Sequence, residues 1–64
     1  MVKVNGEEKN LAGTSISDFL KTTTFNLKFI AVEINEQIIP KAKYGETIIQ
    51  DNDSIEVVSF VGGG

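Results

Sequence analysis

The acidic residues between positions 46 and 56 are the first group whose types and spacing suggest chemistry. They are Glu46, Asp51, Asp53 and Glu56. A calcium-binding loop takes ligands from alternating positions and has a glycine at the sixth, but the run that starts at Asp51 has Ile55 and Glu56 at the fifth and sixth. Paired carboxylates acting as acid and base need a cleft, which a chain of 64 residues hardly supplies. Because Asp and Asn bond nearby backbone groups, a turn is the favoured interpretation.

The hydroxyl side chains form the second group, notably Thr22 to Thr24 and Ser59. A hydroxyl becomes a nucleophile only beside a base, and the chain contains no His. It also contains no Cys, so neither a thiol nucleophile nor a zinc site of the usual kind is available. Capping, turn formation and strand packing account for these hydroxyls.

The final glycines, Gly62, Gly63 and Gly64, are the third group. Without side chains, such an arm can enter a narrow slot in a partner. A terminal carboxylate has a reference pKa of about 3.3 to 3.7, so it is ionised at neutral pH and needs activation before a nucleophile attacks it. Transfer of AMP to this carboxylate would create a leaving group, and the unhindered glycyl carbonyl would then accept sulfur or an amine. Since Cys is absent, carried sulfur must be part of the terminal acyl group. A frayed end is the alternative.

Composition limits the remaining possibilities. The chain is 41% hydrophobic and 23% charged, which is typical of a globular domain. The net charge is −3 and the six Lys are scattered, which argues against nucleic acid and anionic membrane surfaces as partners. We expect a cytoplasmic protein, monomeric when free. A single domain should span residues 1–64, with 62–64 as a flexible tail.

The first element that must support this arm is a β-hairpin. Apolar and polar residues alternate up to Asn5-Gly6, a strong turn signal, so Val2 and Val4 should face the core. The return strand, over residues 8–12, is polar and weak.

A short amphipathic helix follows. Thr14 or Ser15 can cap it, and Asp18 can reach back to the unpaired N–H groups of the first turn. The helix should end near Thr22, because the Thr run is β-branched. Its apolar face would consist of Ile16, Phe19 and Leu20.

The residue pattern in the second half of the chain predicts strands. Alternation indicates a strand over residues 29–34 with a partner over 37–39, then a turn over 41–45, a short extended segment over 47–49, and a long last strand over 54–61. If Ile55 and Val57 face the helix, the opposite sheet face carries apolar residues that lead directly to the arm and read as a partner docking patch. This patch consists of Val58, Phe60 and Ala31.

The order of elements predicts an α+β domain with one main helix packed on one face of a mixed sheet. This layout suits a β-grasp (ubiquitin-like) fold, in which the first and last strands lie side by side at the centre of the sheet.

Four blocks of the sequence form a recognisable combination: Asn5-Gly6, Ile34-Asn35-Glu36-Gln37-Ile38-Ile39-Pro40-Lys41, Asp51-Asn52-Asp53-Ser54-Ile55-Glu56-Val57, and Val61-Gly62-Gly63-Gly64. With these blocks, and over essentially the whole chain, the sequence resembles the small ubiquitin-like sulfur carrier proteins of thiamine (thiazole) biosynthesis. Departures are modest: Lys41 stands where Arg is usual, Tyr44 where Trp is common, and Asn52 where Gly is usual. None of them touches the tail.

The resemblance implies a carrier that is modified by enzymes and is not itself an enzyme. An adenylating, E1-like activating enzyme would use ATP and magnesium to adenylate the Gly64 carboxylate, and a cysteine desulfurase relay would supply sulfur to form a thiocarboxylate. Thiazole synthase would accept that sulfur. Gly62 and Gly63 would thread the partner's channel, and the carrier would bind no cofactor or metal itself.

Four alternatives remain open from the sequence. They are a molybdopterin-type sulfur carrier, a ubiquitin-like modifier that forms isopeptide bonds with Lys, an interaction module whose tail is inert and, last, an enzyme in its own right.

Overall fold

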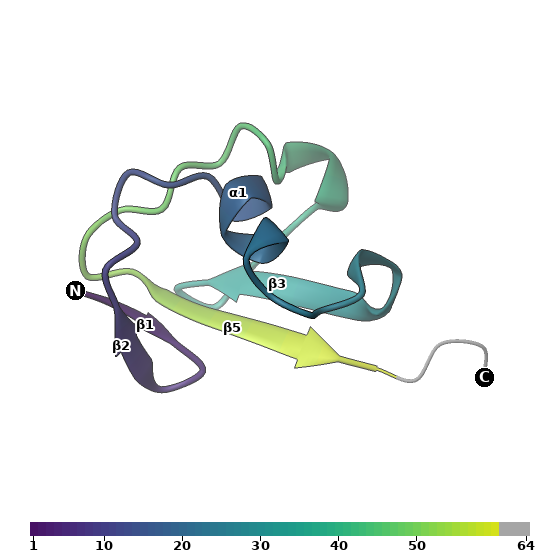
Figure 1. The fold of residues 1–64 in the computed structure, drawn as a ribbon, viewed down its shortest axis with the longest axis horizontal. Coiled ribbons are helices and arrows are strands. Elements are labelled where there is room, and N and C mark those ends of the chain that lie inside the picture. The colour runs from purple at the N-terminus through teal and green to yellow at the C-terminus, as the bar shows by residue number, and fades with distance from the viewer. Residues whose placement is uncertain (61–64) are drawn as a thin grey trace.

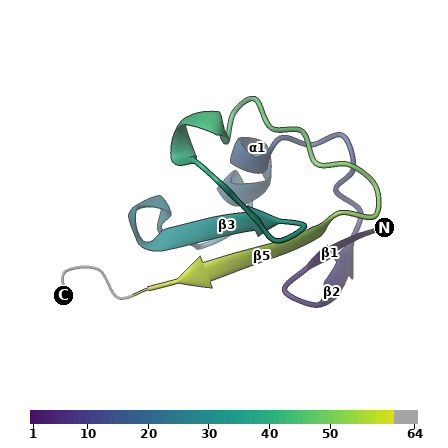
Figure 2. The ribbon, with the colours of Figure 1, turned by 180° about the vertical axis from the view of Figure 1, so that it is seen from behind.

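Five strands form one sheet that carries the helix on one of its faces (Figures 1 and 2). The computed structural model describes residues 1–60. The predicted tail and its residues Gly62, Gly63 and Gly64 therefore lie outside the described residues. The elements in chain order are β1 (Val2–Val4), β2 (Glu7–Lys9), α1 (Ile16–Lys21), the 3₁₀ turn Leu27–Phe29, β3 (Ile30–Ile34), β4 (Gln37–Ile39), the 3₁₀ turn Lys41–Lys43 and β5 (Ser54–Ser59).

The strand order β2-β1-β5-β3-β4 places the first and last strands next to each other. β1 and β5 pair in parallel, and the other neighbouring strands pair antiparallel. The sheet is therefore mixed, with β5 at its centre. The predicted α+β class and central pairing are confirmed.

The first hairpin turns at Asn5 and Gly6, which have φ angles of 50° and 87°. Its return strand is Glu7–Lys9, so the expected range 8–12 was wrong at both ends. The chain leaves the sheet early because Leu11 packs against the core. A backbone bond of 2.8 Å from the Gly13 N–H to the Ile49 carbonyl then holds the chain away from the sheet.

Helix α1 starts as predicted, because the Ser15 hydroxyl accepts a hydrogen bond from the Asp18 N–H at 3.0 Å. The Asp18 carboxylate forms an ion pair with Lys21 at 3.6 Å, and no bond back to the helix start is recorded for it. The helix ends at Thr22. Within residues 1–60, no helix is long and apolar enough to cross a membrane.

One strand boundary differs from its prediction. Phe29 ends the 3₁₀ turn Leu27–Phe29 and does not start β3, because the Asn26 side chain accepts a hydrogen bond from the Lys28 N–H. The segment 47–49 agrees with its predicted extended form: Ile48 forms a β-bridge with Ser15, and the side chain of Ile49 is fully buried.

The core lies between α1 and the sheet. Every apolar residue predicted to face it is buried, and the loops add Tyr44 and Ile49. Burial raises the pKa of the Tyr44 hydroxyl above its ordinary value of 10.0. The core consists of Val2, Val4, Ile16, Phe19, Leu20, Ile30, Val32, Ile34, Tyr44, Ile49, Ile55 and Val57.

Candidate functional site

β5 is the element that leads to the C-terminal glycines. It is the longest strand among the described residues, and its residues Ile55 and Val57 point into the core. The strand ends at Ser59, so the predicted range 54–61 was wrong at Phe60, and residue 61 lies outside the described residues. Its hydrogen bonding continues one residue further, because the Phe60 N–H donates to the Phe29 carbonyl at 2.8 Å. The backbone is therefore held by β3 up to Phe60.

The three residues of the predicted docking patch lie together beside the end of β5. Val58 is directly opposite Ala31 in the β3–β5 register, so their side chains share one face of the sheet. Val58 is 47% exposed and Phe60 is 50% exposed. The structure thus presents the docking patch as an accessible apolar surface on the face opposite α1, at the end of β5.

The same face becomes acidic toward the start of β5. Glu56 is opposite Glu33 in the register, and these two residues line an open depression of about 390 Å³ together with Glu36, Asn35 and Ser54. Strand parity in the sequence predicts Glu56 and Glu33 on the face opposite the helix, and the register confirms that they lie side by side. The sequence did not predict that Glu36 joins them, because Glu36 lies in the turn after β3.

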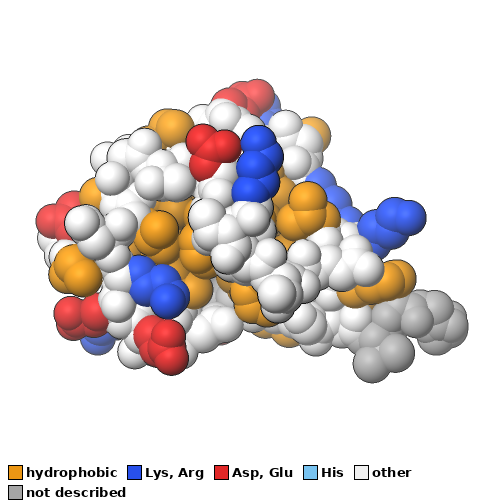
Figure 3. Space-filling model, viewed as in Figure 1, with side chains coloured by type: hydrophobic (Ala, Val, Ile, Leu, Met, Phe, Trp, Pro, Cys, Tyr) orange, Lys and Arg blue, Asp and Glu red, His pale blue; other side chains and the backbone are white. Residues whose placement is uncertain are grey.

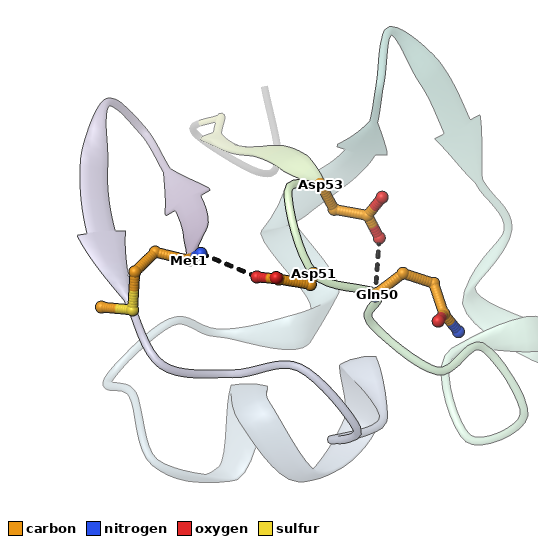
Figure 4. A network of polar contacts seen from close by, with 4 residues as sticks. All are labelled: Met1, Gln50, Asp51 and Asp53. Atoms are coloured by element: carbon orange, nitrogen blue, oxygen red, sulfur yellow. Dashed lines mark hydrogen bonds and ion pairs between the residues drawn. The ribbon is translucent and has the colours of Figure 1, made fainter.

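The acidic turn has a structural role. The Asp51 carboxylate accepts a hydrogen bond of 2.7 Å from the Met1 amino group, and Asp53 accepts one of 2.8 Å from the Gln50 N–H (Figure 4). The amino group, by hydrogen bonding and by charge, holds the pKa of Asp51 below its ordinary value of 3.8. Among residues 1–60 there is no cluster of three or more acidic side chains that could hold a metal ion.

The threonine hydroxyls also serve the backbone. Thr22 and Thr23 donate hydrogen bonds of 2.7 Å to the Phe19 and Leu20 carbonyls at the end of α1. This matches the capping interpretation of the sequence.

Two asparagines hold β5 in place, and sequence reasoning missed this role. Asn5 bonds Val57 through both its amide oxygen and its amide nitrogen, at 2.9 and 3.3 Å. The side-chain oxygen of Asn35 accepts a hydrogen bond from the Ser54 N–H at 3.0 Å, and its amide nitrogen donates one to the Asp53 carboxylate at 3.0 Å. Both have left-handed φ angles, which Asn tolerates. The only sequence signal was their position in turns.

In the view of Figure 3, apolar side chains lie among charged side chains of both signs. Neither sign of charge dominates the face seen in this view.

Comparisons with known proteins agree with this arrangement. The ThiS family model matches residues 2–64. The sulfur carrier protein ThiS of Bacillus subtilis is 42% identical over 67 residues, covering all of both chains. The thiazole synthase of Paramagnetospirillum magneticum is 37% identical over 62 residues, which are 95% of this chain and 19% of that protein. The chain thus spans about a fifth of that relative's length.

A solved structure shares the fold. The thiamine biosynthesis protein ThiS of Geobacter metallireducens superposes with a TM-score of 0.80 at 24% identity, over 98% of this chain and 97% of that one. It supports the β-grasp arrangement of sheet and helix. With the family model matching almost every residue and a full-length relative in B. subtilis, the chain belongs to the ThiS family of sulfur carriers.

Proposed function

We propose that this chain carries sulfur as a thiocarboxylate on Gly64 and delivers it for thiazole formation in thiamine biosynthesis. The observation that carries the proposal is the family match, which runs through to residue 64 and so includes the glycines. The placement of β5 supports it, because its backbone is held by β3 up to Phe60.

The proposed reaction begins with activation, because an ionised carboxylate does not react with nucleophiles. The terminal carboxylate oxygen attacks the α-phosphorus of ATP in an activating enzyme, which releases pyrophosphate and forms an acyl adenylate. A persulfide from a cysteine desulfurase relay then displaces AMP and forms an acyl disulfide with the glycyl carbonyl. A second thiol cleaves the S–S bond, which releases the thiocarboxylate on Gly64 and leaves a disulfide on the relay protein. ATP and magnesium belong to the activating enzyme. The carrier is a co-substrate in this scheme and does not catalyse a step.

Thiazole synthase is the proposed acceptor. The P. magneticum thiazole synthase contains a segment similar to this chain, which supports a working partnership between the two. We assign the docking patch of Val58, Phe60 and Ala31 to contact with partner enzymes, because its exposed apolar surface lies at the end of β5, the strand that precedes the glycines in the sequence.

Intact mass spectrometry tests the proposal. The chain is incubated with ATP, magnesium, the activating enzyme and a sulfur donor, and the expected product has one oxygen replaced by sulfur at Gly64. A variant that lacks Gly64 should fold normally but gain no sulfur, because the reactive carboxylate is displaced by one residue. Sulfur gain by this variant, or none by the native chain under conditions competent for another family member, would contradict the proposal.

The same experiment separates the rival functions. A protein modifier would form a covalent adduct with a lysine-containing protein after adenylation, whereas the carrier should release its sulfur to thiazole synthase and return to its original mass.

A further inference from the structure

β5 is hydrogen-bonded along both of its edges, but over different lengths. On one side, β3 pairs with it from Ile55 to Ser59. On the other side, β1 pairs with it only at Ser54 and Ile55. The two central pairings of the sheet therefore end at different points along β5.

Asn5 marks the point where the shorter pairing ends. Its N–H donates to the Ile55 carbonyl at 2.9 Å, and its side chain occupies the N–H and the carbonyl of Val57. The amide group thus takes the place of the next β1 residue. The chain then turns at Gly6 into β2, and β5 continues past the β1–β2 turn with no other ribbon beside it on that side (Figures 1 and 2).

The backbone of Ser59 faces this open side. The Ser54 carbonyl accepts from the Asn35 N–H at 2.8 Å, and the Phe60 N–H donates to Phe29. Because the hydrogen-bonding direction alternates along a strand, even-numbered residues of β5 bond toward β3 and odd-numbered ones bond toward β1. Ser59 is therefore directed toward the β1 side, beyond Asn5. Among the hydrogen bonds recorded for residues 1–60, none on that side involves its N–H or carbonyl.

Natural proteins usually blunt an open strand edge with charged side chains, Pro or a bulge. None of these is present at this edge: Val58, Ser59 and Phe60 carry no charge and are exposed. An edge left in this state is a template for another extended chain, because backbone pairing needs no particular side chain.

We propose that an extended segment of thiazole synthase pairs through its backbone with β5 at Ser59. This inference rests on the proposed function and adds the contact by which the partner binds the carrier. Ser59 lies between the docking residues Val58 and Phe60 and is the fifth residue before Gly64. A partner that covers the docking patch therefore also reaches this edge. Backbone pairing on both edges would hold β5 in place as far as Ser59.

Proline substitution at Ser59 tests the pairing. Pro has no N–H to donate, and it is tolerated where a strand's N–H faces solvent, so Ser59→Pro should retain the fold by circular dichroism. Isothermal titration with thiazole synthase from the same organism should show an affinity reduced by about tenfold, the effect of about one lost hydrogen bond and the bulk of the ring. Ser59→Ala is the matched control, because it keeps the backbone N–H and should bind like the native chain.

Amide hydrogen exchange on the native chain gives a test that does not depend on any variant folding. In the free protein, the Ser59 amide should exchange faster than those of Val57 and Val58, which are bonded to Asn5 and β3. In the complex with thiazole synthase, the Ser59 amide should slow by at least tenfold.

The outcomes distinguish this inference from the function on which it rests. Unchanged Ser59 exchange in the complex, or native affinity of a folded Ser59→Pro variant, would overturn the edge pairing. Neither result affects the mass-spectrometric gain of sulfur at Gly64 or its transfer to thiazole synthase, which test the proposed function alone.

Discussion

At the scale of single residues, Asn5 combines two properties that other side chains do not offer together. Its φ of 50° lies in the left-handed region, where most side chains are strained. Its amide group also satisfies both backbone groups of Val57, 52 positions further along the chain. The residue therefore forms part of the β1–β2 turn and also bonds the edge of β5 at Val57.

Replacing Asn5 should separate these two contributions. Asn5→Ala loses two hydrogen bonds and adds backbone strain, and should lower the free energy of unfolding by about 2 to 3 kcal/mol. Asn5→Gly loses the same bonds without the strain, so its loss should be about 1 kcal/mol smaller. Urea denaturation measures both. Equal losses in the two variants would show that the left-handed backbone adds no cost.

At the scale of elements, β5 has one buried face and one exposed face, which we expect to serve different purposes. Ile55 and Val57 are buried under α1, whereas Val58 and Phe60 remain exposed on the other face. Substitutions on the outer face should therefore affect partners and leave the core unchanged.

Phe60→Asp should weaken binding to thiazole synthase at least tenfold, since a central aromatic residue is a frequent hot spot. Its free energy of unfolding should change by no more than about 0.5 kcal/mol, as for other surface positions. Isothermal titration and urea denaturation measure the two effects. Ile38→Asp is a matched control: this residue of β4 is 70% exposed on the same face but outside the docking patch, and its variant should bind normally. Unfolding of the Phe60 variant would mean that the side chain supports the core.

The elements also show which features the sequence could reveal. Alternation predicted the buried faces of β3 and β5, because each strand has one face toward α1 and one toward solvent. The 3₁₀ turn at Leu27–Phe29 is too short to produce a detectable pattern of apolar residues. Its cap is local, because the Asn26 side chain accepts a hydrogen bond from the Lys28 N–H. The roles of Asn5 and Asn35 depend on hydrogen bonds between segments that are distant in the sequence. No local pattern carries that information.

At the scale of the whole molecule, both ends of the described chain meet in one sheet. β1 lies beside β5, and the Met1 amino group bonds the Asp51 carboxylate just before β5 begins (Figure 4). This ion pair is exposed, so its effect should be small and sensitive to salt.

Asp51→Asn should therefore lower the melting temperature slightly at pH 7. Because the pKa of Asp51 is depressed in the folded chain, the stability it contributes is present above its ordinary value of 3.8 and is lost as the pH falls through its folded value. The two proteins should consequently melt alike in strong acid, and also at about 1 M salt near neutral pH. Thermal melts across this range check both expectations. A difference that persists in acid would point to the turn geometry instead of the ion pair.

The central place of β5 also governs when the molecule can form. β5 pairs with β1 on one side and with β3 on the other, so the earlier strands have no common partner until residues 54–59 have been made. A nascent chain that ends before them holds two separate hairpins, and isolated hairpins are at best marginally stable. Folding therefore waits until residues 54–59 have been synthesised, and a product truncated before them should be unfolded and open to proteases.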